Sequence, residues 1–252
     1  METARAELLA GGEQRLTEMR QLLSAPASEK WEQDAVQLRV LEILQELGPA
    51  AQSAGPEVAA LVADGMPHVA SVAAQTLPAI GAPAGLAVPV ITRSIQREPT
   101  VVPLRALAEY HEEAGETVSL LMEIMNRHDL DVETRWNAVR TIGKMREAGV
   151  PAIDALGALL NDKEPTVREH AAEALGDIGP TASRAAVALI AALDDEYVKV
   201  RRDAVRSLGQ IDPDRTIAVP AIEKMLEDPE QIVQDAARQA LERLNAPAPS
   251  VE

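Results

Sequence analysis

The chain has 252 residues and a formal net charge of −16, from 24 Lys+Arg against 40 Asp+Glu. Cysteine is absent, which excludes disulfides, thiolate nucleophiles and cysteine-ligated zinc or iron–sulfur sites. The negative charge repels phosphate backbones and anionic lipids, so we expect neither nucleic acid nor a membrane as partner. The charge either keeps the protein soluble or attracts a partner with a basic surface. Because no long apolar segment follows a basic start, we expect no secretory signal and a cytoplasmic location.

Apolar residues make up 46 % of the chain, yet it has no Phe and only two Trp and two Tyr. The core must therefore consist of Ala, Leu, Val and Ile. Such small and branched side chains suit closely packed helices, and they argue against a β-sandwich rich in aromatic residues.

Residues 12–24 and 29–47 are predicted to form two amphipathic helices. In the second of them, Val36, Val40 and Leu44 recur at the spacing of a single buried helix face. A Gly–Pro pair follows at residues 48–49, where Gly ends the helix and Pro cannot continue it.

Residues 65–92 contain no Asp, Glu, Lys or Arg. Several Pro and Gly residues divide this segment into pieces too short to span a bilayer, so we expect no membrane span. One alternative function for the segment is a buried contact within a larger structural assembly.

Residues 165–180, PTVREHAAEALGDIGP, recur with similar sequence 33 and 66 positions later. Recurrence at a fixed period of this length predicts an all-α solenoid of two-helix repeats. Aligning the second helix of every repeat gives about seven anchors: Leu44, Leu77, Leu107, Ile142, Leu175, Leu208 and Leu241. We therefore predict a single array over residues 1–245, with units ending near 48, 81, 111, 146, 179, 212 and 245, and a flexible tail at 246–252.

The consensus of this repeat resembles the HEAT-repeat α-solenoids, particularly their phycobilisome-lyase-like subgroup. The residues that carry the resemblance are Asp162, Val167-Arg168, Ala171, Ala174-Leu175-Gly176 and Ile178-Gly179, with their equivalents one repeat later. The resemblance implies antiparallel helix pairs stacked into a curved right-handed superhelix, with the second helices lining its concave surface. It also implies binding more often than catalysis.

Recurrent Asp and Arg residues accompany the repeat. They pair in sequence as Asp162 with Arg168, Asp195 with Arg201, and Asp129 or Asp131 with Arg135. We expect a structural ladder, in which the Asp caps the second helix and the Arg bridges adjacent units.

Candidate binding residues come from positions expected to point away from the core. If Val167, Ala171 and Leu175 face inward, positions 169, 170 and 173 and their equivalents project outward. In the second to fourth units these positions, normally polar, hold the candidate site residues Val72, Val101, Val102, Arg105, Trp136 and Arg140. Exposed apolar residues with a Trp and flanking Arg are typical of a protein-binding hot spot. The alternative is that the third unit is out of register, so that Val101 and Val102 belong to the core.

We therefore predict a non-enzymatic adaptor or scaffold that needs no cofactor and holds a partner protein. Its oligomeric state stays open. The enzymatic alternatives are a subunit of a metal-dependent hydroxylase or of a tetrapyrrole lyase. The hydroxylase resemblance rests on the single pair His111-Glu112, whereas those enzymes need several such pairs; residues 129–133 lack the Gly of a calcium loop.

Overall fold

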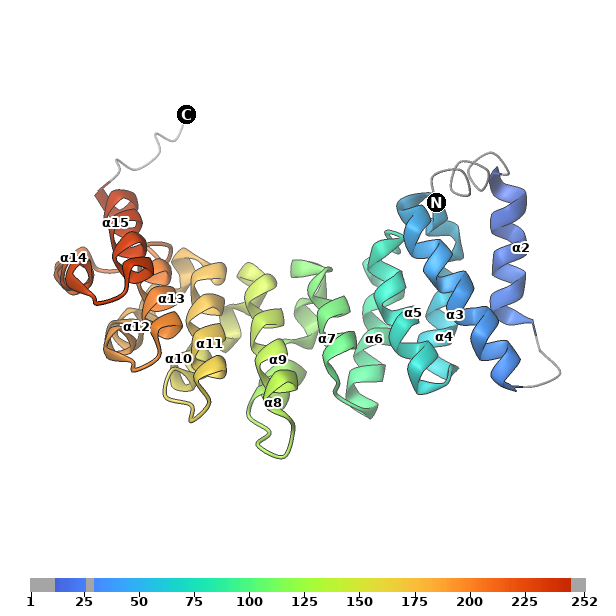
Figure 1. Ribbon diagram of the computed structural model, residues 1–252, viewed down its shortest axis with the longest axis horizontal. Helices are drawn as coiled ribbons and strands as arrows, with labels where there is room; N and C mark the ends of the chain where they lie inside the picture. Colours follow the sequence, from blue (N-terminus) through green and yellow to red (C-terminus); the bar gives the residue numbers. More distant parts are fainter. Residues whose placement is uncertain (1–11, 26–29, 246–252) are drawn as a thin grey trace. The chain divides into compact units, whose positions relative to one another are not determined.

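The computed structural model describes residues 12–25 and 30–245, and within them the chain is helical without strands (Figure 1). Consecutive helices pack in pairs. The pairs are α2 (Gly12–Ser24) with α3 (Lys30–Leu47), α4 (Gly55–Asp64) with α5 (Pro67–Ala79), α6 (Ala84–Arg97) with α7 (Val101–Ala108), α8 (Val118–Met125) with α9 (Val132–Lys144), α10 (Ile153–Leu159) with α11 (Pro165–Ile178), α12 (Ala186–Ala191) with α13 (Val198–Leu208), and α14 (Arg215–Lys224) with α15 (Gln231–Asn245). The predicted all-α fold is confirmed. The predicted tail at 246–252 lies outside the described residues.

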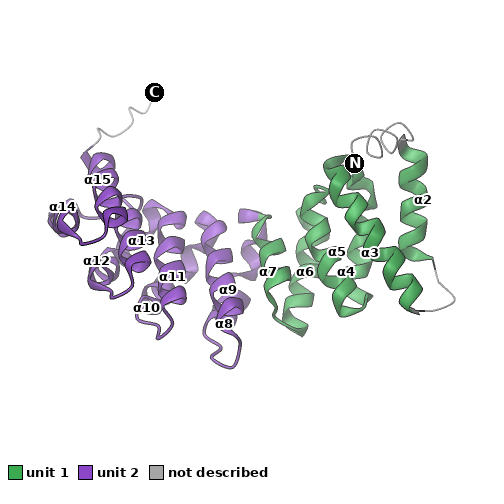
Figure 2. Ribbon diagram, in the orientation of Figure 1, with its two compact units in different colours: residues 1–110 green, residues 111–252 purple. Residues whose placement is uncertain are grey.

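The chain divides into two compact units, residues 1–110 and residues 111–252 (Figure 2). In unit 1 the second helices α3, α5 and α7 pack in succession, as do the first helices α2, α4 and α6. In unit 2 the second helices α9, α11, α13 and α15 do the same. Each unit is therefore a short α-solenoid.

A residue with positive φ lies at each repeat end predicted from 48 to 212. These residues are Gly48, Gly81, His111, Arg146, Gly179 and Asp212. A left-handed residue stops an α-helix and turns the chain, which is why Gly is favoured there. Short 3₁₀ helices begin at or next to four of these ends: η1 (Gly48–Ala54), η2 (His111–Thr117), η3 (Arg146–Ala152) and η4 (Pro180–Ala185). The chain therefore turns at these residues, between one helix pair and the next.

Most predicted core positions are buried. Val36 is an exception: it is 41 % exposed, and the buried face of α3 is formed by Val40, Leu41 and Leu44. Val167, Ala171 and Leu175 are inaccessible to solvent, and so are the anchors Leu44, Leu77, Leu107, Ile142 and Leu208. Leu241 differs, since it is only half-buried. Among the described residues, α15 packs against one neighbouring second helix, α13, whereas α11 packs against both α9 and α13.

Neighbouring second helices of unit 2 approach one another through small residues. A Cβ atom added to Gly143 would lie 2.7 Å from the Cα of Ala174, and one added to Gly209 would lie 2.8 Å from the Cα of Ala240. Distances below 3 Å leave no room for a side chain, so these backbones touch directly. We call this line of contacts the small-residue seam.

The uncharged segment 65–92 forms α5 and the first part of α6. Pro67 lies in the first turn of α5 and Pro83 immediately before α6, while Pro78 and Pro89 lie inside the helices. Throughout the described residues no helix combines the length and the hydrophobicity needed to cross a membrane.

Candidate functional site

Trp136 is fixed on α9 by an aromatic partner from the next repeat. Its indole stacks on the imidazole of His170 in α11, with ring centroids 4.4 Å apart and an interplanar angle of 23°. The side chain is half-buried, so part of the ring faces solvent. Arg140 and Lys144 follow at intervals of four residues, which places all three side chains along one stripe of α9.

A hydrogen bond to a carboxylate on the same helix fixes the imidazole of His170. Its Nδ1 atom lies 3.0 Å from Oε2 of Glu173, one turn further along α11. This hydrogen bond lowers the pKa of Glu173 from its ordinary value to about 2, against the opposing effect of burial, and the charges of Arg206 and Lys144 add to the lowering. Glu173 is therefore ionised at neutral pH and keeps the Trp136–His170 stack in place.

This low pKa predicts an acid-dependent contribution to stability. Because the folded state holds Glu173 ionised, its contribution is complete above the unfolded pKa of about 4.3 and is lost as the pH falls towards 2. We expect Glu173→Gln to destabilise unit 2 by about 2 kcal/mol at pH 6 and by much less at pH 2.5. The value at pH 6 is reduced to allow for solvent screening, because the Glu173 side chain is 25 % exposed. Urea unfolding of both proteins at the two pH values measures this. An equal difference at both pH values would contradict it.

Charged side chains alternate in sign from one second helix to the next. The stripe of α9 is basic, that of α11 is acidic and that of α13 is basic. The resulting pairs are Lys144–Asp177 at 2.8 Å, Arg202–Glu169 at 3.6 Å, Lys199–Glu169 at 3.8 Å and Arg206–Glu173 at 3.8 Å. We call the surface made by these stripes and Trp136 the charged stripe surface.

The prediction that positions 169 and 170 project outward is wrong for part of unit 2. Asn137, Glu169 and Asp203 are buried. The small-residue seam brings the second helices so close together that these positions face the neighbouring helix instead of solvent.

The predicted site residues fall into both units. Val72 on α5 and Val101 and Val102 at the start of α7 are half-buried, and Arg105 on α7 is exposed. Val101 and Val102 are thus not core residues, although their neighbour Leu104 is. The structure places Trp136 and Arg140 together in unit 2. It adds His170 and Glu173, which sequence reasoning did not connect with Trp136, although the stacked rings are 34 residues apart, close to one repeat.

The predicted ladder is present, and its Arg side chains bridge adjacent repeats as expected. Each Arg forms its ion pair with the Asp of the following repeat, while Arg168 and Arg201 also donate a hydrogen bond to the main-chain carbonyl of the Asp in their own repeat. The pairs are Arg135–Asp162 at 2.5 Å, Arg168–Asp195 at 2.6 Å and Arg201–Asp228 at 2.7 Å. Asp131 caps α9 by accepting a hydrogen bond from the amide of Thr134, and Asp129 pairs with Arg127. The hydrogen bond from Arg201 lowers the pKa of Asp228, in keeping with an ionised ladder.

Comparison with known proteins identifies the repeat. The family model of HEAT repeats matches residues 118–196 and 186–250, together more than half of the chain. The chain belongs to the HEAT-repeat family.

A solved structure of a HEAT-like repeat protein has the same fold. An archaeal HEAT-like repeats protein from Thermococcus onnurineus is 11 % identical, with a TM-score of 0.59, over 91 % of this chain and 96 % of that one. An engineered protein is 19 % identical (TM-score 0.49) over 90 % and 96 % of the two chains, and the complex of CpcE and CpcF of phycocyanin lyase from Nostoc sp. is 20 % identical (TM-score 0.48) over 62 % and 98 %. No curated protein matches the chain. At these identities the likeness concerns the fold alone.

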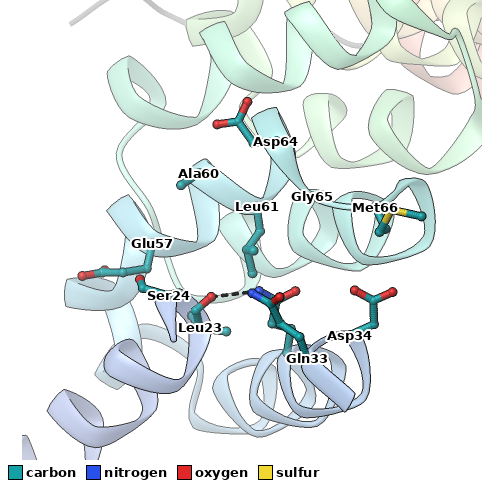
Figure 3. Close-up of a pocket in the computed structure, with 11 residues that line it drawn as sticks. Leu23, Ser24, Gln33, Asp34, Glu57, Ala60, Leu61, Asp64, Gly65 and Met66 are labelled. Atoms are coloured by element: carbon teal, nitrogen blue, oxygen red, sulfur yellow. Dashed lines mark hydrogen bonds between the residues drawn. The ribbon is translucent and has the colours of Figure 1, made fainter. Parts of the chain in front are cut away.

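The first HEAT pairs of unit 1 enclose a separate cavity of about 350 Å³ between α2, α3 and α4 (Figure 3). Two of its lining residues are hydrogen-bonded to each other: the side-chain amide of Gln37 donates to the carbonyl of Leu23 at 2.9 Å. Two lining carboxylates already have partners, since Asp34 lies 3.3 Å from Nε2 of His68 and Glu57 accepts a hydrogen bond from Arg20. These contacts form no nucleophile–base arrangement.

Sequence reasoning also missed Trp31, whose side chain is 68 % exposed at the start of α3. The rarity of Trp, with two in the chain, was the signal that could have marked it for attention, and in the structure neither Trp is a core residue. Trp31 has no aromatic stacking partner within the described residues, unlike Trp136.

His111, the residue behind the hydroxylase alternative, begins η2 with positive φ, and its Nδ1 atom lies 3.3 Å from the carbonyl of Lys144. Across residues 12–25 and 30–245 no three His, Asp or Glu side chains gather in a way that could hold a metal ion.

Proposed function

We propose that this HEAT-repeat protein is a non-enzymatic adaptor that binds a segment of a partner protein on the charged stripe surface, with Trp136 as the anchor. The observation that carries the proposal is the Trp136–His170 stack. A half-exposed indole that is already fixed loses little conformational freedom on binding, so more of its contact energy becomes affinity. Trp and Arg are also the residues that dominate binding hot spots, and Arg140 lies one turn away.

The arrangement of the second helices supports this function. The small-residue seam joins α9 to α11 and α13 to α15, and α11 packs directly against α13, so side chains of successive repeats stand at regular intervals. A helix or an extended segment that lies across such rows contacts several repeats at once. The HEAT family supports the coarser inference that the fold serves protein interaction.

The partner-binding role of Trp136 has a matched control in Trp31. We expect Trp136→Ala to weaken partner binding by about 2 kcal/mol or more, roughly thirtyfold, while Trp31→Ala binds as the wild type does. Affinity capture with the three proteins identifies the partner, and calorimetry of the purified pair measures the affinities. Circular dichroism verifies that both variants keep their helices. Unchanged affinity in a folded Trp136→Ala protein would refute the assignment.

The absence of catalysis, the absence of a cofactor and the cytoplasmic location stay predictions. Metal content and visible absorbance of the purified protein test the hydroxylase and lyase alternatives directly. Bound iron or a bound tetrapyrrole would replace the adaptor proposal.

A further inference from the structure

We propose that the segment bound by the charged stripe surface is acidic; this inference rests on the proposed function. Five cations form its outer layer: Arg140, Lys144, Lys199, Arg202 and Arg206. We call them the cationic layer. The net charge of the whole chain, −16, would by itself favour a basic partner, but the charges are unevenly distributed over the surface.

Basic residues of unit 2 are concentrated on its second helices. Helices α9, α11, α13 and α15 carry ten basic and seven acidic side chains, whereas residues 111–252 as a whole carry 16 and 27. The acidity of unit 2 therefore lies mainly on the first helices and the loops. A basic partner would be attracted there, not to Trp136.

In the four ion pairs that join neighbouring helices of the charged stripe surface, the cation is the more exposed member. Side-chain exposure is 34 % for Lys144 against 24 % for Asp177, and 40 % for Arg206 against 25 % for Glu173. The side chain of Glu169 is 11 % exposed, whereas those of its two partners, Lys199 and Arg202, are 49 % and 33 % exposed. The carboxylates thus lie deeper and the cations face an incoming partner, which meets a positive layer.

Arg202 is held by two hydrogen bonds to Asp203 and Lys144 by one to Asp177, but Arg140 and Arg206 keep hydrogen-bonding capacity for a partner. Arg140 forms no ion pair within the described residues. The pairs that join Arg206 to Glu173 and Asp203 are both 3.8 Å long, beyond hydrogen-bond distance. A guanidinium has five donors and binds a carboxylate through two of them, so Asp or Glu of a partner fits here. An apolar side chain of the same segment would cover Trp136.

A short acidic segment fits this surface better than a nucleic acid. The cationic layer is local, and a long polyanion that extended beyond it would meet the acidic remainder of a chain with net charge −16. A peptide that spans α9 to α13 stays within the layer.

The test is selection from a displayed library of random short peptides on the full-length protein. We expect enriched peptides to contain Asp or Glu beside an apolar residue, and their affinity to fall with added salt. Arg140→Glu should weaken them by about tenfold or more. The control Arg215→Glu changes an Arg on α14 that is half-exposed and outside the surface, and it should leave affinity within about twofold. Labelled single-stranded RNA is the second probe and should not bind.

The outcomes separate the two proposals. Peptides that depend on Trp136 but are neutral or basic, or that bind Arg140→Glu unchanged, would overturn the acidic partner and leave the adaptor site standing. Enriched peptides that ignore Trp136→Ala would overturn the proposed site itself. Tight RNA binding lost in Arg140→Glu would replace the acidic peptide by a nucleic acid, and a library without any enriched peptide would contradict both proposals.

Discussion

Asp162→Ala is expected to destabilise unit 2 by about 3–5 kcal/mol, the largest effect of any single substitution proposed for this protein. The side chains of Asp162 and Arg135 are 4 % and 1 % exposed. Burial, the largest single influence, opposes ionisation of Asp162. The hydrogen bonds from Arg135 and from the amide of Glu164, together with the charge of Arg135, outweigh it and lower the pKa of this carboxyl group. Removing the carboxylate would leave the Arg135 guanidinium buried beside Met125, whose carbonyl accepts its Nε–H, without a counter-charge.

Urea unfolding followed by circular dichroism measures this loss. The matched control is Asp129→Ala, which removes an Asp from an exposed ion pair. In that pair Arg127 is 46 % and Asp129 66 % exposed, so the substitution should leave the unfolding midpoint almost unchanged. Replacing both buried partners, Arg135→Met with Asp162→Leu, should restore much of the stability because no charge is then left unpaired. Similar midpoints for Asp162→Ala and Asp129→Ala would show that the ladder contributes no more than a surface pair.

Gly143→Ala is expected to destabilise unit 2 by about 2 kcal/mol, although Ala is the better helix former. The new methyl group would lie 2.7 Å from the Cα of Ala174, so α9 and α11 would have to separate. Since the obstacle is backbone and not a flexible side chain, the shift would disturb both helices.

Gly157→Ala is the control, since it also changes a Gly within a helix of unit 2. Its Cβ would meet only the Cβ of Ala188, at an ordinary 3.9 Å. Helix propensity should therefore dominate and stabilise the protein by up to about 1 kcal/mol. Thermal unfolding of the two variants should shift in opposite directions. Stabilisation by both substitutions would show that the seam is loose.

Much of the fold could be predicted because a repeated sequence reports the same local structure several times. The register of Val167 and its equivalents placed the buried face, and the Gly–Pro stops placed the helix ends. His111, Arg146 and Asp212 are not Gly, yet at their repeat ends they have positive φ, as Gly48, Gly81 and Gly179 do at theirs. Periodicity within a helix carries this information without knowledge of its neighbours.

The candidate site was harder to predict because it depends on distances between helices. Arg168 could not be assigned to Asp195 instead of Asp162 until the helices were placed side by side. The burial of Asn137 and Asp203 likewise depends on how closely the seam draws the second helices together. Trp136 was identified from its position in the repeat, whereas its stack on His170 needed the structure.

The ladder also has a consequence for how the chain folds. Its three ion pairs each join residues 27 positions apart, and the hydrogen bond from Ser207 to the carbonyl of Ala172 spans 35. Closing a loop of about one repeat costs little entropy, and each repeat that is already folded offers the next one an Asp, a seam and an apolar face. We therefore expect unit 2 to assemble by rapid stepwise addition of repeats onto a nucleus, with amide hydrogen exchange slowest where a repeat has folded neighbours on both sides.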